Sequence, residues 1–336
     1  MGTICGDGCR NRMAAWVIAP AIMAVAWAGN TVAQSWQPDR AVEIIVGTSP
    51  GGGQDRSARF VQKLIQDNKL VAVPTAVVNK PGAGSSIGYT YLNQQEGNAH
   101  HLMLLTVPLI TNYITGISPI SHADLTPVST LFDDYIVATV IPGSPIKSAS
   151  DLMDRIRKDP SSVSVGIPSI TGGGGLVILL AAKGAGIDPK RVKTVVFKSG
   201  GDSVSALLGG HVDVMMSTTA APVAQLKAGR VRILGIASPK RLHGMLATVP
   251  TLTEQGVKVV FSNWRGIVGP KGLSSAQVAY WEGVYAKLVE VDEFKRDLER
   301  RFWVSGYRDS AGMAGFLKAQ HEELTGLLRD LGMAKR

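Results

Sequence analysis

Short apolar runs rich in valine and isoleucine alternate with segments of helical spacing along most of the chain after residue 41. Parallel strands buried on both faces give such runs, and the helices between them return the chain to the next strand. The pattern therefore predicts an α/β fold. The predicted strands are 42–46, 75–78, 101–106, 134–141, 162–167, 194–197, 212–216, 232–237 and 257–268. The predicted helices are 57–67, 86–95, 176–184, 202–208, 220–228, 275–302 and 310–331.

One further helix is expected to begin at a cap on Ser148 or Ser150 and to run into Arg157. The segment 275–302 is expected to break near Val291. Extended runs at 134–142 and 257–268 divide these elements into two α/β sets, with the first set completed by the C-terminal part of the chain. We therefore expect two lobes, residues 34–136 with 260–336 and residues 137–259, joined by a hinge of two crossing strands.

The first 33 residues have the pattern of a secretory signal peptide. Arg10 and Arg12 precede an apolar run from residue 13 to residue 28, and small side chains lead up to Ala33. The run is shorter than the ~20 residues that span a bilayer, so we expect cleavage near Ala33 and a periplasmic location rather than a membrane anchor. Both cysteines, Cys5 and Cys9, lie in this segment. The mature chain therefore has no thiol for a disulfide, a nucleophile or a metal site.

Basic residues give the chain a formal net charge of +9. They are scattered, without the basic runs and neighbouring aromatic residues of a nucleic-acid stripe, so no nucleic-acid partner is expected. A modest positive field favours small anionic ligands instead.

Three glycine-rich segments each join a predicted strand to a predicted helix: GTSPGGGQD at 47–55, KPGAGSSIG at 80–88 and SITGGGGL at 169–176. The first amide groups of a helix have no partner within it, and the helix dipole adds positive charge there. Glycines let an anion approach these groups. Because loops that follow parallel strands meet at one edge of the sheet, loops from two lobes can face each other across a cleft. The pattern predicts a site for a phosphate or a carboxylate.

Enzymatic motifs fit this chain poorly. The third glycine of a dinucleotide fingerprint is replaced by Arg56 in the first loop and by Val177 in the third. The six histidines lack the spacing of a zinc helix, so no metal and no cofactor are expected. Ser86 stands in a G-x-S-x-G match, but residues 79–83 separate it from the strand. It is interpreted as a helix cap, with a secreted serine hydrolase using Ser86 as the alternative and no other catalytic residue.

Seven segments, in order along the chain, resemble the Bug family of extracytoplasmic solute receptors of tripartite tricarboxylate transporters, whose citrate member is TctC. The segments are SPGGGQDRSAR, VVNKPGAGSSIG, YIVATVIPGSPIKSASDL, GGHVDVMMS, LKAGRVRILGIAS, ATVPTLTEQG and NWRGIVGPKG. The resemblance covers nearly all of the chain after the signal. It implies a two-lobed, type II-like periplasmic binding fold that closes on its ligand.

The same resemblance implies a monomeric receptor for a small di-, tri- or aromatic carboxylate, which it delivers to a membrane permease of two unlike subunits. An orphan receptor that signals to a sensor kinase is the other reading. The family often has an acidic residue or Asn near Ser217, and the loss of that group here disfavours a ligand with a free ammonium. The expected ligand-binding residues are Thr48, Pro50, Gly51, Gly52, Gly53, Gln54, Asp55, Ala83, Gly84, Ser85, Ser86, Thr106, Ser169, Thr171, Gly172, Gly173, Gly174, Lys198 and Ser217.

For two side chains, Lys198 and Trp264, the sequence leaves two interpretations open. Lys198 either places a cation near the cleft or is simply exposed. Trp264 either lines the ligand or packs at the hinge.

Overall fold

The computed structural model describes residues 36–336, so the predicted signal peptide lies outside the described residues. The chain forms two sheets. The six-stranded sheet contains β1 (Val42–Val46), β2 (Thr75–Asn79), β3 (His101–Leu105), β4 (Leu125–Asp133), β10 (Trp264–Pro270) and β11 (Val304–Arg308), in the order β11-β4-β10-β3-β1-β2. The five-stranded sheet contains β5 (Ile136–Val140), β6 (Val165–Ile167), β7 (Thr194–Val196), β8 (Val214–Thr218) and β9 (Arg232–Ile236), in the order β7-β6-β8-β5-β9.

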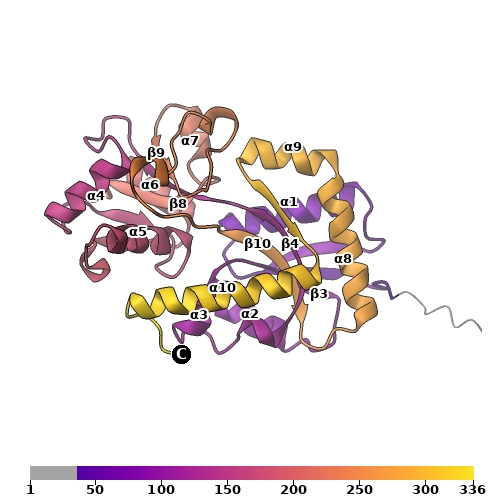
Figure 1. Cartoon of the computed structure of the whole chain (residues 1–336). Coiled ribbons are helices and arrows are strands. Elements are labelled where there is room, and N and C mark those ends of the chain that lie inside the picture. The colour runs from indigo at the N-terminus through magenta and orange to yellow at the C-terminus, as the bar shows by residue number, and fades with distance from the viewer. Residues whose placement is uncertain (1–35) are drawn as a thin grey trace, which may run out of the picture. The chain divides into compact units, whose positions relative to one another are not determined.

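Helices cover both sheets (Figure 1). We call the first lobe the six-stranded sheet together with the helices α1 (Gly53–Asp67), α2 (Ser86–Asn93), α3 (Pro108–Ile114), α8 (Ser275–Glu290), α9 (Asp292–Arg301) and α10 (Ser310–Asp330). We call the second lobe the five-stranded sheet together with the helices α4 (Ala149–Lys158), α5 (Gly173–Gly184), α6 (Gly200–Leu208) and α7 (Val223–Lys227). The predicted α/β class is confirmed.

Side chains of the six-stranded sheet alternate between two apolar cores. In β1, the alternate residues Val42, Ile44 and Val46 join the core under α1, α8 and α9. Ile45 joins the core under α2, α3 and α10. In β3 the same alternation puts Leu104 on the first side and Met103 on the second. A continuous apolar run therefore serves two helix layers, as expected for a strand covered on both faces.

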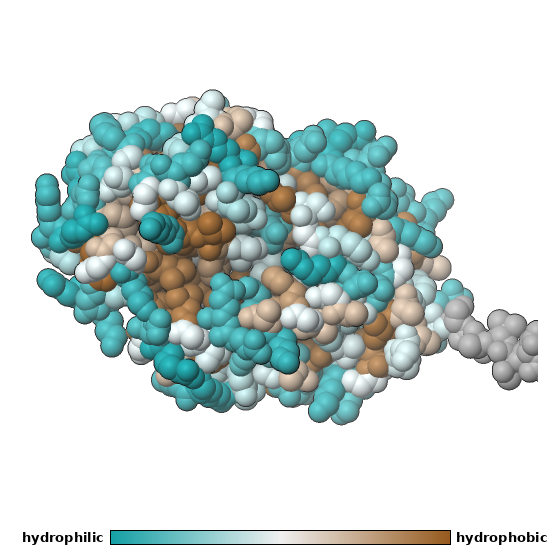
Figure 2. All heavy atoms as spheres, in the orientation of Figure 1, coloured by the Kyte–Doolittle hydropathy of each residue, from teal (hydrophilic) through white to brown (hydrophobic). Residues whose placement is uncertain are grey.

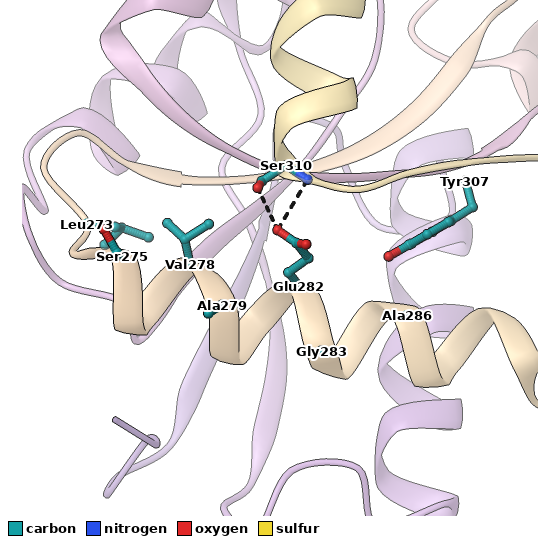
Figure 3. A pocket seen from close by; sticks show the side chains of 9 residues that line it. All are labelled: Leu273, Ser275, Val278, Ala279, Glu282, Gly283, Ala286, Tyr307 and Ser310. Carbon is teal, nitrogen blue, oxygen red and sulfur yellow. Dashed lines mark hydrogen bonds between the residues drawn. The ribbon is translucent and has the colours of Figure 1, made fainter. Parts of the chain in front are cut away.

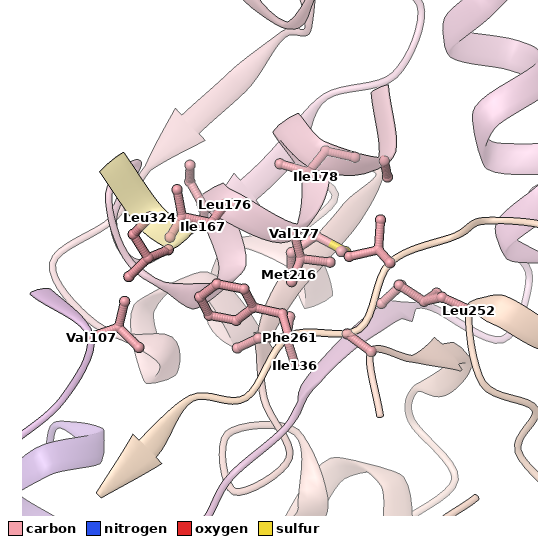
Figure 4. Close-up of a cluster of buried hydrophobic side chains, with 14 of the residues drawn as sticks. Val107, Ile136, Ile167, Leu176, Val177, Ile178, Met216, Leu252, Phe261 and Leu324 are labelled. Carbon is pink, nitrogen blue, oxygen red and sulfur yellow. The ribbon is translucent and has the colours of Figure 1, made fainter. Parts of the chain in front are cut away.

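The second of these cores continues into the second lobe. Val107 and Leu324 from the first lobe belong to one buried cluster with Ile167, Leu176 and Phe261 (Figure 4). On the face shown in Figure 2, apolar side chains (brown) gather in a hollow over the part of the molecule where Figure 1 shows α5. The two lobes are thus held together by apolar packing as well as by the chain that passes between them.

Strand direction differs from the prediction at the places where the chain changes sheet. Strands β1, β2 and β3 are parallel to one another, as are β6, β7 and β8. By contrast, β10 is antiparallel to both of its neighbours, and so is β5. The chain enters the second lobe between β4 and β5 and returns before β10, which begins at Trp264, later than the start of the predicted extended run at residue 257.

Three elements were not predicted: α3, β4 and β11. In β4 the apolar pattern is interrupted by hydroxyl side chains and by Pro127. Thr126 Oγ1 donates to the Pro270 carbonyl at 2.7 Å, and Thr130 Oγ1 donates to the Gly306 carbonyl at 2.6 Å. Cross-strand partners therefore compensate for the polar groups, which a local pattern does not reveal.

The predicted helix boundaries agree better with the structure where a capping residue marks the end of the helix. Ser148, rather than Ser150, caps α4 by accepting from the Asp151 amide, and the break at Val291 between α8 and α9 is confirmed. Helices α1 and α5 begin at Gly53 and Gly173, several residues before the predicted starts. Glycine is a poor helix former, so its presence in a first turn is hard to foresee from propensity.

Two histidine rings, His122 before β4 and His321 on α10, lie with their centroids 5.0 Å apart. Their Nδ1 atoms are buried and have no hydrogen-bond partner in the described part of the chain. Burial lowers the pKa of His122 and the nearby His321 adds to the effect, while Asp124 opposes it. The other groups near the pair are Tyr113, which faces His321, and Arg336, which covers the Tyr113 ring.

This pair predicts an acid-sensitive stability. Because the pKa of His122 is lower in the folded than in the unfolded state, the unfolded state binds more protons below about pH 6.5, and stability falls as the pH falls. We expect the free energy of unfolding to decrease from about pH 7.5 to 5.5, and to decrease less in His122→Phe. Urea denaturation at the two pH values measures both. An unchanged pH dependence in His122→Phe would contradict the assignment.

Candidate functional site

The first turn of α1 is an open set of backbone donors. Its N-cap, Gly52, is extended (φ −68°, ψ 167°) and offers no side-chain cap. The first hydrogen bond into the helix runs from the Arg56 amide to the Gly52 carbonyl at 3.0 Å. The amides of Gly53, Gln54 and Asp55 have no acceptor among residues 36–336. These three N–H groups sit at the positive end of a helix of 15 residues.

Helix α5 repeats this arrangement in the second lobe. Its N-cap, Gly172, is also extended (φ −91°, ψ 174°) and without a side-chain cap. The first helical bond comes from the Leu176 amide at 2.9 Å, so the amides at 173–175 find no acceptor within the described chain. Only glycine fits here, because a Cβ on Gly174 would lie 2.2 Å from the Met216 carbonyl oxygen and one on Gly175 2.3 Å from that of Ile170.

Both helix N-termini lie beside the same stretch of chain at the start of β10. A Cβ built on Gly53 would lie 3.9 Å from Arg265 Nη2, and one built on Gly173 would lie 3.5 Å from Asn263 Cβ. Residues 263 and 265 are two positions apart. The free amides of α1 and α5 therefore both lie near residues 263–265, and amides at a helix N-terminus are suited to bind an anion.

Side chains of the first loop hold its backbone in shape. Gln54 accepts from the Gly47 amide at 3.2 Å and donates to Thr106 Oγ1 at 2.8 Å. Asp55 accepts from the Gly51 amide at 2.8 Å. Burial alone would raise the pKa of Asp55, but hydrogen bonds from Arg59, Gly51 and Asn79 outweigh it and hold the pKa below its usual value. Gln54, Asp55 and Thr106 are thus internal supports of the loop.

Thr48 differs from these supports. Its Oγ1 is buried and has no hydrogen-bond partner in the part of the chain that the structure describes. It lies 3.0 Å from the place of a Cβ on Gly52. A buried hydroxyl without a partner is unusual, and in this loop it is available to a ligand.

The second loop is strained. Ala83, Gly84 and Ser85 all have positive φ (45°, 63° and 83°), which is costly for residues other than glycine and concentrates at functional sites. Ser85 Oγ donates to the Gly47 carbonyl at 3.1 Å. The interpretation of Ser86 as a helix cap is wrong: the N-cap of α2 is Ser85, and it makes no side-chain cap bond, because its hydroxyl is directed to the first loop.

Asn112 on α3 connects loops of both lobes, and the sequence analysis missed it. Its Nδ2 donates to the Gly84 carbonyl at 2.6 Å, and its Oδ1 accepts from Thr171 Oγ1 at 3.1 Å. Thr111 Oγ1 donates to the Thr171 carbonyl at 2.8 Å, and Ser169 Oγ lies 3.3 Å from Thr171 Oγ1. The signal in the sequence is a Thr-Asn pair inside the otherwise apolar run PLITNYI.

A buried ion pair, also missed, ties the two crossings together. Arg265 Nη2 lies 3.2 Å from Asp134 Oδ2, and the side chains are 2% and 1% exposed. Asp134 also accepts from the amide and the hydroxyl of Thr219, and Arg265 donates to the Asn263 carbonyl at 2.8 Å. Burial raises the pKa of Asp134, which Arg265 and Thr219 oppose, and burial lowers that of Arg265. An arginine within an apolar strand, WRGIVGP, is the signal that could have revealed it.

The remaining expected residues lie around these loops. Pro50 is exposed on the first loop, and Ser217 is buried in β8, where its Oγ donates to the Thr218 carbonyl at 3.3 Å. Lys198 follows β7 at the same sheet edge, is exposed, and forms no ion pair with the described residues. Trp264 is 1% exposed and packs edge-on against Phe316, in agreement with the packing interpretation.

A cavity in the first lobe lies elsewhere. It has a volume of about 540 Å³ and is lined by α8, β11 and the start of α10 (Figure 3). Its carboxylate, Glu282, points to Ser310 and accepts from the amide and the hydroxyl of that residue at 3.4 and 2.5 Å. Glu282 therefore completes the first turn of α10, and we assign no ligand to this cavity.

Residues 36–336 contain no group of three or more His, Cys, Asp or Glu side chains able to hold a metal ion. No helix in that range has both the length and the apolar character to cross a bilayer.

Comparison with curated proteins gives relatives along most of the chain. The UPF0065 protein in the gbd 5' region of Cupriavidus necator is 26% identical over 302 residues, which is 89% of each chain. BugT of Bordetella pertussis is 28% identical over 255 residues, which is 74% of this chain and 76% of BugT.

Solved structures share the fold. The periplasmic binding protein BugD superimposes with a TM-score of 0.80 at 21% identity, over 89% of this chain and 100% of BugD. MatC from Rhodopseudomonas palustris, solved with bound malate, gives 0.77 at 20% identity over 87% and 99%. An R. palustris protein solved with adipate gives 0.81 at 21% identity over 88% and 99%. The two-lobed periplasmic binding fold is therefore confirmed.

A family model assigns the chain itself. The model for TctC, described as the tripartite tricarboxylate transporter family receptor, matches residues 58–332, which is well over half of the chain. The chain thus belongs to the TctC family of tripartite tricarboxylate transporter receptors, which are periplasmic solute-binding proteins and not enzymes.

Proposed function

We propose that this receptor captures a small carboxylate between the first turns of α1 and α5 and delivers it, as a monomer, to a membrane permease of two subunits. The observation that carries the proposal is the convergence of two uncapped, glycine-rich helix N-termini, one from each lobe, beside residues 263–265. Free amides at a helix N-terminus bind anions without help from a basic side chain. The division at residues 136 and 260, and the ligand-binding residues named above, are part of this proposal.

The related structures support an acid as ligand. MatC was solved with malate and its R. palustris neighbour with adipate, and both are dicarboxylates. In this chain a bound carboxylate would accept from amides of both lobes, so it would stabilise the arrangement in which the lobes are closed over the one in which they are apart. That difference in free energy is what a permease can recognise.

A substitution at Gly53 tests the location of the site. A Cβ atom fits there, since the nearest heavy atom to its position is Arg265 Nη2 at 3.9 Å, and we expect Gly53→Leu to fold. We expect Gly53→Leu to weaken carboxylate binding at least about tenfold, because the side chain stands beside the free amides. Isothermal titration measures the affinity, and the melting temperature without ligand reports folding.

The ligand for this test comes from a thermal-shift screen of mono-, di-, tri- and aromatic carboxylates on the unaltered protein, since a ligand of the native state raises its melting temperature. Gly326→Leu is the matched control, because Gly326 is exposed on α10 with no heavy atom within 4 Å of its Cβ position. If no carboxylate raises the melting temperature, the proposed function is wrong. If Gly53→Leu binds as tightly as the unaltered protein, the location is wrong.

A further inference from the structure

The guanidinium of Arg56 lies against the first glycine loop. Arg56 is the fourth residue of α1, and its Nη1 donates to the Gly51 carbonyl at 2.7 Å. The side chain is only partly exposed. Through this bond the side chain folds back onto the loop that leads to the free amides, and it places a positive charge beside that loop.

Arg56 has no internal counter-ion. Its two arginine neighbours are each paired: Arg59 Nε lies 3.0 Å from Asp55 Oδ2, and Arg265 Nη2 lies 3.2 Å from Asp134 Oδ2. No carboxylate of residues 36–336 lies within ion-pair distance of Arg56. The charges of the two neighbours are thus compensated within the fold, whereas that of Arg56 is not.

The position is unfavourable for an uncompensated cation. Arg56 belongs to the first turn of α1, where the helix dipole repels positive charge. Burial lowers the pKa of Arg265, and the positive charge of Arg56 nearby lowers it further. An anion placed beside Arg56 would relieve both interactions. A guanidinium has five N–H donors, and Arg56 uses one of them on Gly51, so donors remain for such an anion.

We propose that Arg56 binds a second carboxylate of the ligand, so that the receptor selects dicarboxylates over monocarboxylates of the same chain length. The inference rests on the proposed function, in which the amides of α1 and α5 hold the first carboxylate. Backbone amides recognise a carboxylate without regard to what it is attached to, so a side chain must supply the selection. A guanidinium suits this role because it matches a carboxylate with two parallel hydrogen bonds.

Matched acids separate the two carboxylates. Isothermal titration would compare succinate with butyrate, glutarate with pentanoate and adipate with hexanoate, on the unaltered protein and on Arg56→Gln, Arg56→Lys and Arg300→Gln. We expect the unaltered protein to prefer the dicarboxylate of a pair. In Arg56→Gln, affinity for that dicarboxylate should fall about 10- to 100-fold, the range for a hydrogen-bonded charge, and affinity for its monocarboxylate partner should stay within about threefold.

The other two variants control for charge and for shape. Arg300→Gln removes an exposed arginine on α9, whose side chain is 69% exposed, and should leave every affinity unchanged. Arg56→Lys keeps the charge but not the paired donors and should give an intermediate affinity for dicarboxylates.

Each result decides between the two proposals. The role of Arg56 would be overturned if Arg56→Gln lost affinity equally for both acids of a pair, or if the unaltered protein preferred monocarboxylates. Either result would leave the proposed function standing. A protein that binds none of the six acids would refute the selection of dicarboxylates. The proposed function falls as well if the wider thermal-shift screen also finds no ligand.

Discussion

Replacing Asp134 with alanine is expected to lower the free energy of unfolding by about 3–5 kcal/mol, because it leaves the buried guanidinium of Arg265 without its counter-ion. The pair is fully buried and joins the two passages of the chain between the lobes. Asp134 also accepts from the amide and the hydroxyl of Thr219, so the substitution removes a partner from two further polar groups at once. Urea denaturation measures the change.

Two control variants test whether the loss comes from the buried, unpaired charge. Asp154→Ala breaks an ion pair with Arg157 in which both side chains are more than half exposed, and it should cost less than about 1 kcal/mol. The double variant Asp134→Leu with Arg265→Met replaces both charges by apolar groups and should be less destabilised than Asp134→Ala alone. A loss below about 1 kcal/mol in Asp134→Ala would show that Arg265 finds solvent or another partner.

Replacing Phe302 with alanine is expected to cost about 3–5 kcal/mol, the range for a buried phenylalanine. Phe302 ends α9 in the left-handed region (φ 61°, ψ 29°) and is 5% exposed. Its ring belongs to a cluster with residues of the second lobe, among them Val137, Ile236 and Leu246. Packing against the second lobe therefore outweighs the backbone strain of a non-glycine residue in this conformation.

The strain predicts an unusual order of variants. Phe302→Gly should be less destabilised than Phe302→Ala by about 1 kcal/mol, although glycine removes more of the side chain, because glycine accepts positive φ. Phe294 is the matched control, since it is equally buried but lies inside α9. There glycine should be worse than alanine, by about 1 kcal/mol. If the order at Phe302 is the same as at Phe294, the left-handed conformation is not what limits this position. Midpoints of urea denaturation report all four values.

Local patterns were enough to predict the elements on which the candidate site is built. The strands β1 and β2 and the loops after them are encoded by apolar runs followed by glycine, and both signals are short in range. The same holds for β6 and the loop that leads into α5. Because parallel strands present their carboxyl ends at one edge, placing these loops together needed no knowledge of distant contacts.

Long-range partners explain what was missed. Arg265 and Asp134 are 131 residues apart, and neither is recognisable as buried until the two crossings are side by side. Asn112 connects Gly84 with Thr171 only because α3 lies between the second and third loops. Polar residues in an apolar segment were visible in both cases, but the sequence does not say which partner satisfies them.

The tight packing of the glycine loops limits how a receptor of this design can be redirected to another compound. A Cβ on Gly47 would lie 2.2 Å from Ser85 Cβ, and Gly174 has as little room beside Met216. Random mutagenesis of these positions would therefore yield mostly misfolded protein. New chemistry has to be introduced through side chains that border the loops and have space to change, such as Arg56, which makes that codon the first to randomise when a biosensor for a different acid is built on this scaffold.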